Sequence, residues 1–581
     1  MLALTLLGPL LAALAILGLR RAPEALALAG AGFGFAGALG LFVAVSGGDT
    51  VGIALPFLPD FPIRLIASPL TATLSLVVAT VAAMVLIYAV GYMGKDPERV
   101  RFFATMLLFV TAMQALVLAG DWITLLAAWE MIGFASYLLI GFWHGRAGVA
   151  EAATRAFLYT RSADLGLYIG AFVLIGAAGT SEISVTLATT GTPALVGGLL
   201  LLIAAMGKSA QVPLQDWLMR AMAGPTPVSA LLHSATLVAA GAILLIRTAP
   251  MLPGGALLAV GIVGGATAVI AGLIALAERD LKRLLAASTA SQYGLMLVAI
   301  GAGVPVAALL HLIAHAAIKS SLFLGAGVFQ HDRAIAALAL AGIPPLAAFF
   351  SKDAILAAAL ESSAAPWLLP LALAGSVLTG AYMGRALEVL WDGDAGPALV
   401  PVPFMAVGMG VLVVLAAGLG FSFGALEYML GAEIEKPGWI VPAMGLAVGL
   451  GGLALGWFVT PARLLGPLLT PAQNGFSVAG GMDAVILRPA MAVASGCEQL
   501  ERRLFDIVIA VGRINLSFGR AARSTDTNGI DAAIFGLVRR TIAAGARARR
   551  LQSGFIHREL ALTFAGIAIV VGVLLAAPLY F

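Results

Sequence analysis

Ionisable side chains within apolar segments are the first candidates for chemistry in this sequence. Glu130 follows Trp129 midway along one apolar segment, and Lys208 lies in another. If these segments cross a bilayer, each charge costs about 2.5–3.5 kcal/mol at the bilayer centre. Arg161 and Asp164 lie three residues apart, close enough to pair on one helix face. We therefore expect Glu130 and Lys208 to transfer protons, whereas Arg161 and Asp164 either join them or form a neutralised pair that fixes helix packing.

A proline follows Lys208 in the run Gly207-Lys208-Ser209-Ala210-Gln211-Val212-Pro213-Leu214. Pro213 removes a backbone donor and is expected to break the helix, and broken helices line ion pathways in transporters. Burial destabilises the charged form of an amine, so Lys208 could load and release a proton. The freed carbonyls and Ser209 are expected to hold water beside the ammonium group.

Three basic groups follow each other on a later apolar segment. His311, His315 and Lys319 are spaced at i, i+4 and i+8, which places them along one stripe of one helix. Such a stripe is typical of a proton relay, although each histidine by itself could be a buried core residue. His233, in the segment after the Lys208 break, is a further member of this predicted relay.

A second proline break precedes a second buried lysine. Pro344 and Pro345 stand a few residues before Lys352 and Asp353, five segments after Lys208. The recurrence predicts an internal repeat of two five-helix units, each with its own broken helix, as in inverted-repeat transporters. The alternative is that Lys352 and Asp353 form an interfacial pair near a helix end.

The elements that must position these residues are membrane-spanning helices. Of the 581 residues, 61% are hydrophobic and only 11% are charged, which leaves too little polar surface for a water-soluble protein. Apolar stretches of about 20 residues, the length that crosses a bilayer, recur along the chain. We predict an all-α polytopic fold with sixteen spans. They are 1–19, 24–46, 67–93, 102–120, 122–143, 152–176, 194–218, 226–248, 251–277, 282–302, 305–328, 334–358, 366–391, 401–421, 437–460 and 560–580.

Three further features limit the possible structures. The segment from Val51 to Leu65 alternates and contains three prolines, which predicts a surface hairpin or loop. The N-terminus lacks a basic start and a small-residue cleavage site, so we expect residues 1–19 to remain as the first span. Cys497 is the single cysteine, which excludes a disulfide framework and a thiolate-bound cluster in this chain.

The positions of the cations predict the orientation of the spans, because short cytoplasmic loops are enriched in Lys and Arg. An outward N-terminus places eleven cations on the cytoplasmic side and only three outside, so both termini are predicted to face outward. The cytoplasmic cations are Arg20, Arg21, Lys95, Arg99, Arg101, Arg146, Arg220, Arg279, Lys282, Arg283 and Arg333, and the outer ones are Arg64, Arg247 and Lys436.

The segment 482–559 is too charged to cross a membrane but has a helical pattern. Apolar residues recur every three or four positions, which predicts an amphipathic helix lying in the membrane interface. They are Leu500, Leu504, Ile507, Val508, Val511, Ile514 and Phe518. Eleven arginines from Arg502 to Arg558 suit anionic lipid, and no fold for reading bases accompanies them. Residues Ser524 to Gly529 are expected to interrupt this helix or form a loop.

Four runs of this sequence resemble the L subunit of bacterial respiratory complex I, an antiporter-like, proton-pumping subunit of NADH-quinone oxidoreductase. The runs are Trp129 to Phe142, Gly207 to Leu218, Ala223 to His233 and Phe349 to Leu356, and the likeness covers nearly the whole chain. The resemblance implies that Glu130 is the family's helix-five glutamate and that Lys208 is its first broken-helix lysine. It also implies that Lys352 with Asp353 forms the second site.

The resemblance extends the set of site residues and the domain organisation. It implies that His233, His311, His315 and Lys319 form the central relay and that Asp164 is the acidic partner near Arg161. It identifies 482–559 as the family's lateral helix. The expected regions are N-terminal helices 1–101, repeats 102–248 and 251–391, C-terminal core helices 401–460, the lateral helix 482–559 and an anchoring span 560–581.

The resemblance further implies the protein's activity and its surroundings. The chain would translocate protons through its Glu, Lys and His side chains in a bacterial inner membrane, driven by redox chemistry in partner subunits. No nucleotide fingerprint of the G-x-G-x-x-G kind follows a strand, so FMN and iron–sulfur clusters are expected in the partners, with no cofactor or metal in this chain. Neighbouring membrane-arm subunits and lipids are the expected partners, and no nucleic acid is expected.

The sequence departs from the family in one segment, and two alternative functions are compatible with it. The run Gln330-His331-Asp332-Arg333 leads at once into Ala334, so the half-helix before Lys352 is expected to be short and the outlet there wetter. An Mrp-type cation/proton antiporter subunit, or an antiporter-like subunit of another ion-translocating complex, shares the same core. A passive scaffold, whose buried charges only hold helices together, is the other alternative.

Overall fold

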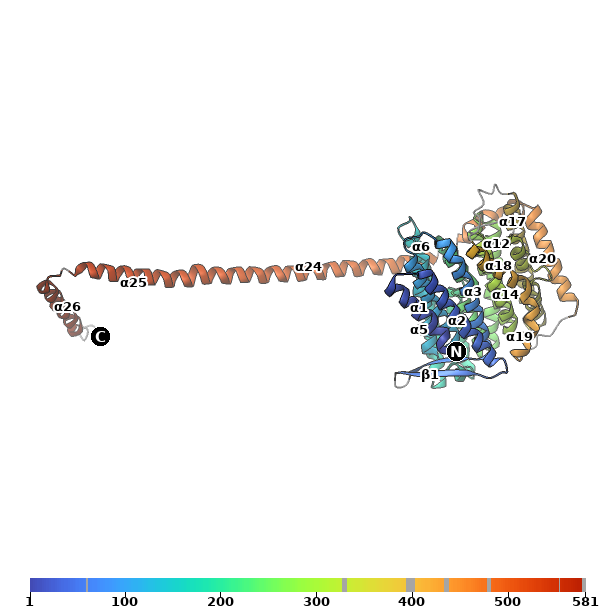
Figure 1. The fold of residues 1–581 in the computed structure, drawn as a ribbon, viewed down its shortest axis with the longest axis horizontal. Helices are drawn as coiled ribbons and strands as arrows, with labels where there is room; N and C mark the ends of the chain where they lie inside the picture. The colour runs from blue at the N-terminus through green and yellow to red at the C-terminus, as the bar shows by residue number, and fades with distance from the viewer. Residues whose placement is uncertain are drawn as a thin grey trace. The chain divides into compact units, whose positions relative to one another are not determined.

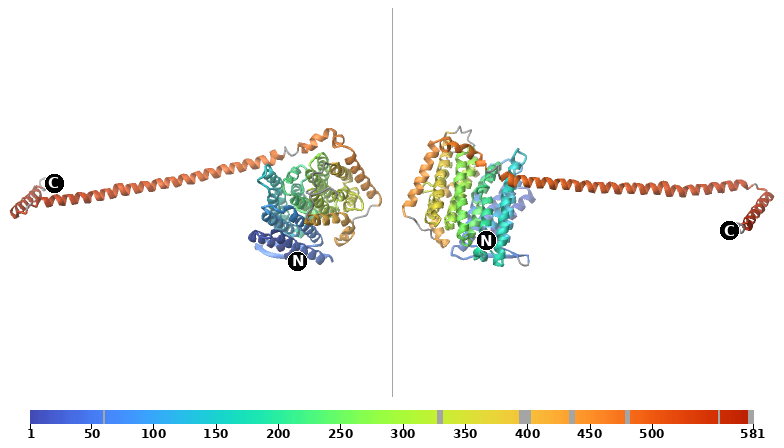
Figure 2. Two further views of the ribbon diagram at one scale, coloured as in Figure 1. Left: turned by 45° about the horizontal axis from the view of Figure 1, so that its top comes forward. Right: turned by 180° about the vertical axis from the view of Figure 1, so that it is seen from behind.

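The computed structural model describes residues 1–58, 61–326, 332–392, 403–432, 438–477, 482–552 and 554–576. These residues are almost entirely helical, as predicted. Fifteen of the described helical segments are long and apolar enough to cross a membrane. The chain divides into two compact units, Met1–Ala490 and Met491–Phe581, and Figures 1 and 2 show the helices of the first unit packed side by side.

The first part of the chain contains two helices, a strand pair and two further helices. These elements are α1 (Leu2–Leu19), α2 (Pro23–Val45), β1 (Val51–Leu58), β2 (Phe61–Ala67), α3 (Pro69–Met93) and α4 (Arg99–Leu118). The strands pair antiparallel, with Val51 opposite Ala67 and Leu55 opposite Ile63. The prediction of a hairpin between the second and third spans is therefore confirmed.

The next part of the chain holds most of the candidate site residues. Its helices are α5 (Trp122–Ile140), α6 (Val149–Ala178), α7 (Ile183–Thr186), α8 (Gly191–Lys208), α9 (Asp216–Arg220), η1 (Ala221–Ala223), α10 (Thr226–Ser234), α11 (Ala239–Thr248) and η2 (Ala249–Met251). The side chain of Asp121 accepts a hydrogen bond from the backbone N–H of Thr124 and so caps the start of α5. The predicted helix break at Pro213 is confirmed, because α8 ends at Lys208 and α9 begins only at Asp216.

The second half of the bundle repeats the pattern of a broken helix among longer ones. Its helices are α12 (Gly254–Ala277), α13 (Leu281–Gly301), α14 (Pro305–Ala326), α15 (Asp332–Ala341), α16 (Ala347–Glu361), α17 (Ala365–Asp392), α18 (Pro403–Gly418), η3 (Leu419–Ser422), α19 (Phe423–Met429) and α20 (Ile440–Phe458). The predicted span 334–358 is two helices, α15 and α16, and neither is long enough by itself to cross a bilayer. This division accounts for the difference between sixteen predicted spans and fifteen.

The half-helix α15 is short, as expected, with ten residues that rise about 15 Å. The chain breaks between Ala341 and Ala347, where Gly342 has a φ of +87°, a left-handed conformation that glycine adopts without steric cost. The peptide bonds before Pro213 and Pro345 are both cis. The existence of both breaks is confirmed, whereas the inverted relation of the two five-helix units stays a prediction.

The remaining elements lead from the bundle to the C-terminal unit. They are α21 (Pro461–Leu465), η4 (Gly466–Leu468), α22 (Leu469–Gln473), η5 (Gly475–Ser477), η6 (Asp483–Leu487), α24 (Arg488–Ser524), η7 (Thr525–Asp531), α25 (Ala532–Leu551) and α26 (Ile556–Ala576). The apolar stripe from Leu500 to Phe518 lies on α24 and is exposed, so the predicted amphipathic helix is confirmed.

The expected interruption of this helix at residues 524–529 is wrong. Residues Thr525–Asp531 form a π-helical segment that continues α24 into α25. The side-chain amide of Asn528 donates to the Ser524 hydroxyl at 3.2 Å, one turn earlier. Polar residues here therefore bond to each other along the helix, and the wider π turn accommodates them without a loop.

Some predictions fall on residues that the structure does not describe. Gln330 and His331, in the run before α15, are among them, as are Pro59 in the hairpin turn and Lys436 in the orientation argument. The side chain of Arg333 also lies outside the described part, although its backbone belongs to α15.

Candidate functional site

Lys208 lies at the C-terminal end of α8 with only 1% of its surface exposed. Its Nζ is 3.4 Å from Oδ2 of Asp164, a residue of α6 that is 2% exposed. The ammonium group also lies 5.4 Å from the centre of the Trp129 ring. A carboxylate, an aromatic face and the negative end of the α8 dipole thus all stabilise the charged lysine.

Trp129 holds the carboxylate that pairs with Lys208. Its indole Nε1 donates to Oδ1 of Asp164 at 2.6 Å, so each oxygen of Asp164 has its own partner. Gly133, one turn further along α5, faces the same lysine, because a Cβ there would lie 3.1 Å from its Nζ. We call Lys208, Asp164 and Trp129 the first lysine site.

Glu130 and Arg161 form a separate ion pair beside the first lysine site. Glu130 also accepts a hydrogen bond from the Tyr168 hydroxyl at 2.5 Å. The alternative that Arg161 and Asp164 form a neutralised pair is therefore wrong in this structure, since Arg161 pairs with Glu130 and Asp164 pairs with Lys208.

Helix geometry explains these pairings. Residues 129 and 130 are adjacent on α5, so their side chains leave the helix about 100° apart. Residues 161 and 164 on α6 diverge by about 60°, and of these two Arg161 is exposed whereas Asp164 is buried. Trp129 and Asp164 point inward and therefore contact Lys208, whereas Glu130 and Arg161 point away from it and pair with each other.

The break after Lys208 is stabilised by hydrogen bonds to neighbouring segments. The Ser209 hydroxyl donates to the carbonyl of Val238 at 2.7 Å and accepts from the N–H of Ala242. Trp217 Nε1 donates to the Gly207 carbonyl at 2.9 Å. Ser209 thus joins the break after Lys208 to the segment around Val238, and the expectation that it also holds water beside the ammonium group stays a prediction.

His311 connects three helices of the second half. Its Nε2 lies 3.0 Å from Oε1 of Gln292 on α13, and its Nδ1 lies 2.9 Å from the Ser351 hydroxyl on α16. Gln292 in turn donates to Tyr382 and Thr379 on α17. Because Ser351 immediately precedes Lys352, His311 places the predicted relay next to the second broken helix.

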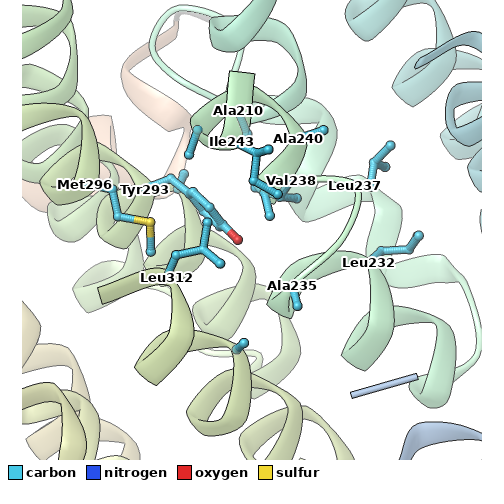
Figure 3. Packing of buried hydrophobic residues seen from close by; sticks show 14 of the residues in the cluster. Ala210, Leu232, Ala235, Leu237, Val238, Ala240, Ile243, Tyr293, Met296 and Leu312 are labelled. Carbon is cyan, nitrogen blue, oxygen red and sulfur yellow. The ribbon is translucent and has the colours of Figure 1, made fainter. Parts of the chain in front are cut away.

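His315 and Tyr293 both face the end of α10. His315 Nδ1 lies 3.4 Å from the carbonyl oxygen of Ser234, to which the Tyr293 hydroxyl also donates at 2.9 Å. Figure 3 shows the Tyr293 ring pointing toward the segment that carries Ala235 and Val238. The rings of His311 and His315 have centroids 6.4 Å apart, so the two histidines follow each other along α14 as predicted.

Lys319 and His233 complete the group of buried basic residues. Lys319 donates to the carbonyl of Leu285 at 3.0 Å and to the Ser288 hydroxyl, both on α13. The His233 ring lies against Phe323 on α14, with centroids 5.2 Å apart, and within the described residues neither of its nitrogens has a hydrogen-bond partner. We call His233, His311, His315 and Lys319 the histidine relay.

Lys352 and Asp353 form the second lysine site, but they do not pair with each other. The Lys352 ammonium group donates to the carbonyl of Leu340 at 2.5 Å, near the C-terminal end of α15. Asp353 turns toward Gly445 on α20, where it leaves no room for a side chain. Its Oδ1 is buried and has no hydrogen-bond partner among the described residues. A cavity of about 10 Å³ borders both side chains, roughly the space of one water.

The structure thus brings the predicted residues into three groups with unequal connections. His311 and Ser351 join the histidine relay to the second lysine site, whereas no hydrogen bond in the described part joins Lys208 to His233. Sequence reasoning gave no role to Trp129 and missed Tyr168, Gln292, Tyr293 and Ser351 as polar partners. Their polar groups lie on otherwise apolar spans, and that signal could have identified them.

Comparisons with known proteins define the class first. Residues 119–336 match the family model described as NADH:quinone oxidoreductase/Mrp antiporter, TM, and residues 59–103 match the model of the N-terminus of complex I chain 5. The Mrp complex from Dietzia sp. DQ12-45-1b contains a chain with a TM-score of 0.72 and 26% identity over 99% of this chain. This chain spans only 63% of that chain's length. An archaeal membrane-bound sulfane sulfur reductase, with a TM-score of 0.66 and 20% identity, shares the fold.

Sequence relatives then define the family. NADH-quinone oxidoreductase subunit L of Mycobacterium tuberculosis is 34% identical over 565 residues, which cover 87% of this chain and 85% of the relative. Chain 5 of the NAD(P)H-quinone oxidoreductase of Picosynechococcus sp. is 38% identical over 369 residues, covering 56% of this chain and 55% of the relative. The chain belongs to the NADH-quinone oxidoreductase subunit L family and is a multi-pass membrane protein.

Proposed function

We propose that this chain is the distal proton-translocating subunit of the membrane arm of a NADH:quinone oxidoreductase. The observation that carries the proposal is the buried pair of Lys208 and Asp164 at the end of a broken half-helix, in a chain of the subunit L family. A charged pair that only held helices together would have no need of a helix break beside it. A titrating pair benefits from the break, because the interrupted backbone opens a route for protons.

The geometry suggests how the first lysine site responds to redox chemistry elsewhere. Arg161 lies on the same helix as Asp164 and is at present paired with Glu130. If Glu130 is neutralised, Arg161 is released and competes with Lys208 for Asp164, so the lysine loses its counter-charge and gives up its proton. At 3.4 Å, the attraction between Lys208 and Asp164 is on the order of 5 kcal/mol at an effective dielectric constant of about 20. Moving one charge against 100 mV costs about 2.3 kcal/mol, so loss of this pair suffices for one step.

The proton then passes through the histidine relay toward the second lysine site. His315 and His311 follow one another on α14, and the Ser351 hydroxyl joins His311 to the residue before Lys352. The gap between Lys208 and His233 requires water or a side-chain movement to be crossed. Lys352, Asp353 and the small cavity beside them are the proposed exit.

The surroundings of the chain follow from the same family membership. Neighbouring membrane-arm subunits and lipids are the proposed partners, and FMN and the iron–sulfur clusters belong to other subunits. We place the chain in a bacterial inner membrane with both termini outside, because that orientation leaves most loop cations on the cytoplasmic side. The enzyme activity is that of the whole complex, with no redox centre in this chain.

A second candidate function is that of an antiporter subunit of an Mrp-type complex. The specific observation in its favour is that the chain from the Dietzia Mrp complex aligns with 99% of this chain at a TM-score of 0.72. Identity favours the first function, since it is 34% to the M. tuberculosis subunit L and 26% to the Mrp chain. Purifying the chain from its native membrane separates the two, because only the first complex oxidises NADH.

Replacing Lys208 with Ala in the complete complex tests the proposed function. Proton pumping into reconstituted vesicles should fall strongly, while NADH oxidation by the assembled complex partly persists. Lys95→Ala is the matched control, because Lys95 is an exposed lysine outside the described helices and should pump normally. A passive scaffold would instead lose assembly before it lost pumping. Normal pumping by an assembled Lys208→Ala complex would contradict the proposal.

A further inference from the structure

A charged cluster outside the candidate proton path lies where the chain approaches its C-terminal unit. Arg155 on α6 is only 8% exposed, and its guanidinium group contacts two carboxylates from other segments, besides the exposed Glu151 one turn earlier on α6. It lies 2.9 Å from Oδ2 of Asp483 and 3.5 Å from Oδ2 of Asp216. A buried arginine with two acidic partners is stable only while both remain in place, because each supplies part of its counter-charge.

The two carboxylates have further partners that fix their positions. The hydroxyl of Tyr159, one turn after Arg155 on α6, donates to Oδ1 of Asp483 at 2.7 Å. Arg220 Nε donates to Oδ2 of Asp216 at 2.6 Å. Both oxygens of Asp483 are therefore bound by α6, and hydrogen bonds in which one partner is charged are the stronger kind.

The residues of this cluster belong to elements next to the lateral helix and next to the first lysine site. Asp483 is the first residue of η6, which runs directly into α24. Asp216 is the first residue of α9, the helix that follows the break after Lys208. Arg155 also shares α6 with Asp164, nine residues and about 14 Å along the helix axis. One arginine thus joins the start of the lateral helix to α6 and α9, the two elements beside the first lysine site.

The chemistry of the cluster favours positioning over proton transfer. The cluster borders a polar cavity of about 450 Å³ that is also lined by Glu151, Asp280 and Arg283, so protons could reach it. However, an arginine does not lose its proton in proteins. Arg155, the residue at the centre of the cluster, is therefore suited to holding its partners in place and not to passing protons on.

We infer that Arg155 is a positioning residue that fastens the root of the lateral helix, residues 483–487, to the half of the bundle that contains Lys208. The attachment itself rests on the contacts alone. Its consequence for proton transfer rests on the proposed function, because α6 and α9 can hold the first lysine site in place only if that site titrates.

Hydrogen exchange in the complete purified complex tests the attachment directly. In an Asp483→Asn variant, the backbone amides of residues 483–487 should exchange about tenfold faster, as expected for the loss of one hydrogen bond to a charged group. The matched control is Glu151→Gln, which also removes a carboxylate near Arg155 but an exposed one at 3.9 Å; exchange should stay at the wild-type rate. Equal exchange in wild type and Asp483→Asn would overturn the inference.

A milder variant tests the same attachment if Asp483→Asn does not assemble. Tyr159→Phe removes only the hydroxyl that binds Asp483, so it should speed exchange at 483–487 by severalfold. When Tyr159→Phe is combined with Asp483→Asn, the loss of protection against exchange should be smaller than the sum of the two single losses. Full additivity would overturn the inference. In the same samples, the proton-to-electron ratio should fall with Asp483→Asn and stay normal with Glu151→Gln, which a purely local role at the surface would not produce.

The two readouts separate this inference from the proposed function. Faster exchange with a normal proton-to-electron ratio would confirm the attachment but overturn its positioning role. Unchanged exchange would overturn the attachment, whatever Lys208→Ala does to pumping. Normal pumping in an assembled Lys208→Ala complex would contradict the proposed function without affecting the exchange result.

Discussion

The two lysine sites share a sequence signature but differ in their electrostatic surroundings. Lys208 ends the half-helix before its break and meets a carboxylate from another helix. Lys352 lies in the half-helix after its break and reaches back to the carbonyl of Leu340. Both ammonium groups therefore lie at the C-terminal, partially negative end of the helix before the break. Lys208 is itself the last residue of α8, whereas Lys352 lies on α16 and its side chain extends to the end of α15.

The difference lies in the acidic partner. Asp164 comes from a separate helix and can approach Lys208 directly, whereas Asp353 is adjacent to Lys352 on the same helix. Adjacent side chains on a helix diverge by about 100°, so Asp353 faces α20 and its Oδ1 has no hydrogen-bond partner within the described residues. The comparison teaches that an acid next to a lysine in sequence is a poor sign of a pair, and that an acid on a neighbouring helix is a better one.

The largest expected difference concerns the two aspartates. Asp164→Asn leaves the Lys208 charge buried without its partner, so it should destabilise the subunit by about 3–5 kcal/mol. Asp353→Asn changes a carboxyl group that has no ion pair among the described residues, so stability should stay the same or rise. Thermal unfolding of the purified complexes measures both effects, and equal losses in the two variants would break the comparison.

Trp129→Phe should produce a smaller loss at the first lysine site. The change keeps most of the ring but removes the Nε1 donor to Asp164, which should cost about 1.5–3 kcal/mol for a hydrogen bond to a charged group. The same thermal measurement applies, with Trp143→Phe as a control, because Trp143 donates to Asp96 at the surface at 3.2 Å. If Trp143→Phe lost as much stability as Trp129→Phe, the loss in Trp129→Phe could not be attributed to the burial of the Trp129–Asp164 hydrogen bond.

Glu130→Gln should lower pumping. The Glu130–Arg161 pair has 28% and 43% of its two side chains accessible, on membrane-spanning helices, and the change leaves the Arg161 charge without this partner. The proton-to-electron ratio should fall, because Arg161 is then free to compete for Asp164. A wild-type ratio would remove Glu130 from the proposed mechanism.

The smallest effect is expected in the lateral helix. Inserting flexible residues at Thr527, within the π-helical segment, should leave pumping nearly unchanged if the helix acts as a clamp, because a clamp tolerates slack. Truncation after Pro461 is the contrasting variant and should release the subunit, since it removes both the apolar stripe and α26. An assembled insertion variant that oxidises NADH without pumping would favour mechanical transmission by a sliding helix.

The fold was largely predictable from sequence because lipid leaves few options. Apolar segments of the right length must be helices in a bilayer, and prolines beside Lys208 and Lys352 identified both broken helices. The π-helical segment was not predictable, because Asp526, Asn528 and Gly529 are typical of loops. Only the Asn528–Ser524 hydrogen bond and the continuing helix show how these residues are accommodated.

The residues that gather at the candidate site around Lys208 were predictable from the sequence, whereas the ion pairs that they form were not. Residue types and spacing identified Glu130, Arg161, Asp164 and Lys208, but spacing along one helix cannot show which residues of another helix they face. The rotation of α5 relative to α6 decides that Asp164 meets Lys208 and that Arg161 meets Glu130. Arg155 and Asp483 were missed for the same reason, because their contact joins residues 328 positions apart in the chain.

The central claim is that the Lys208–Asp164 pair titrates during turnover, and one double variant tests it most directly. Lys208→Met with Asp164→Asn removes both charges together, which avoids the penalty of a single buried charge and is often neutral for stability. The measurement is the proton-to-electron ratio of the reconstituted complex. We predict an assembled complex that oxidises NADH and pumps fewer protons per electron, and an assembled complex with the wild-type ratio would contradict the account.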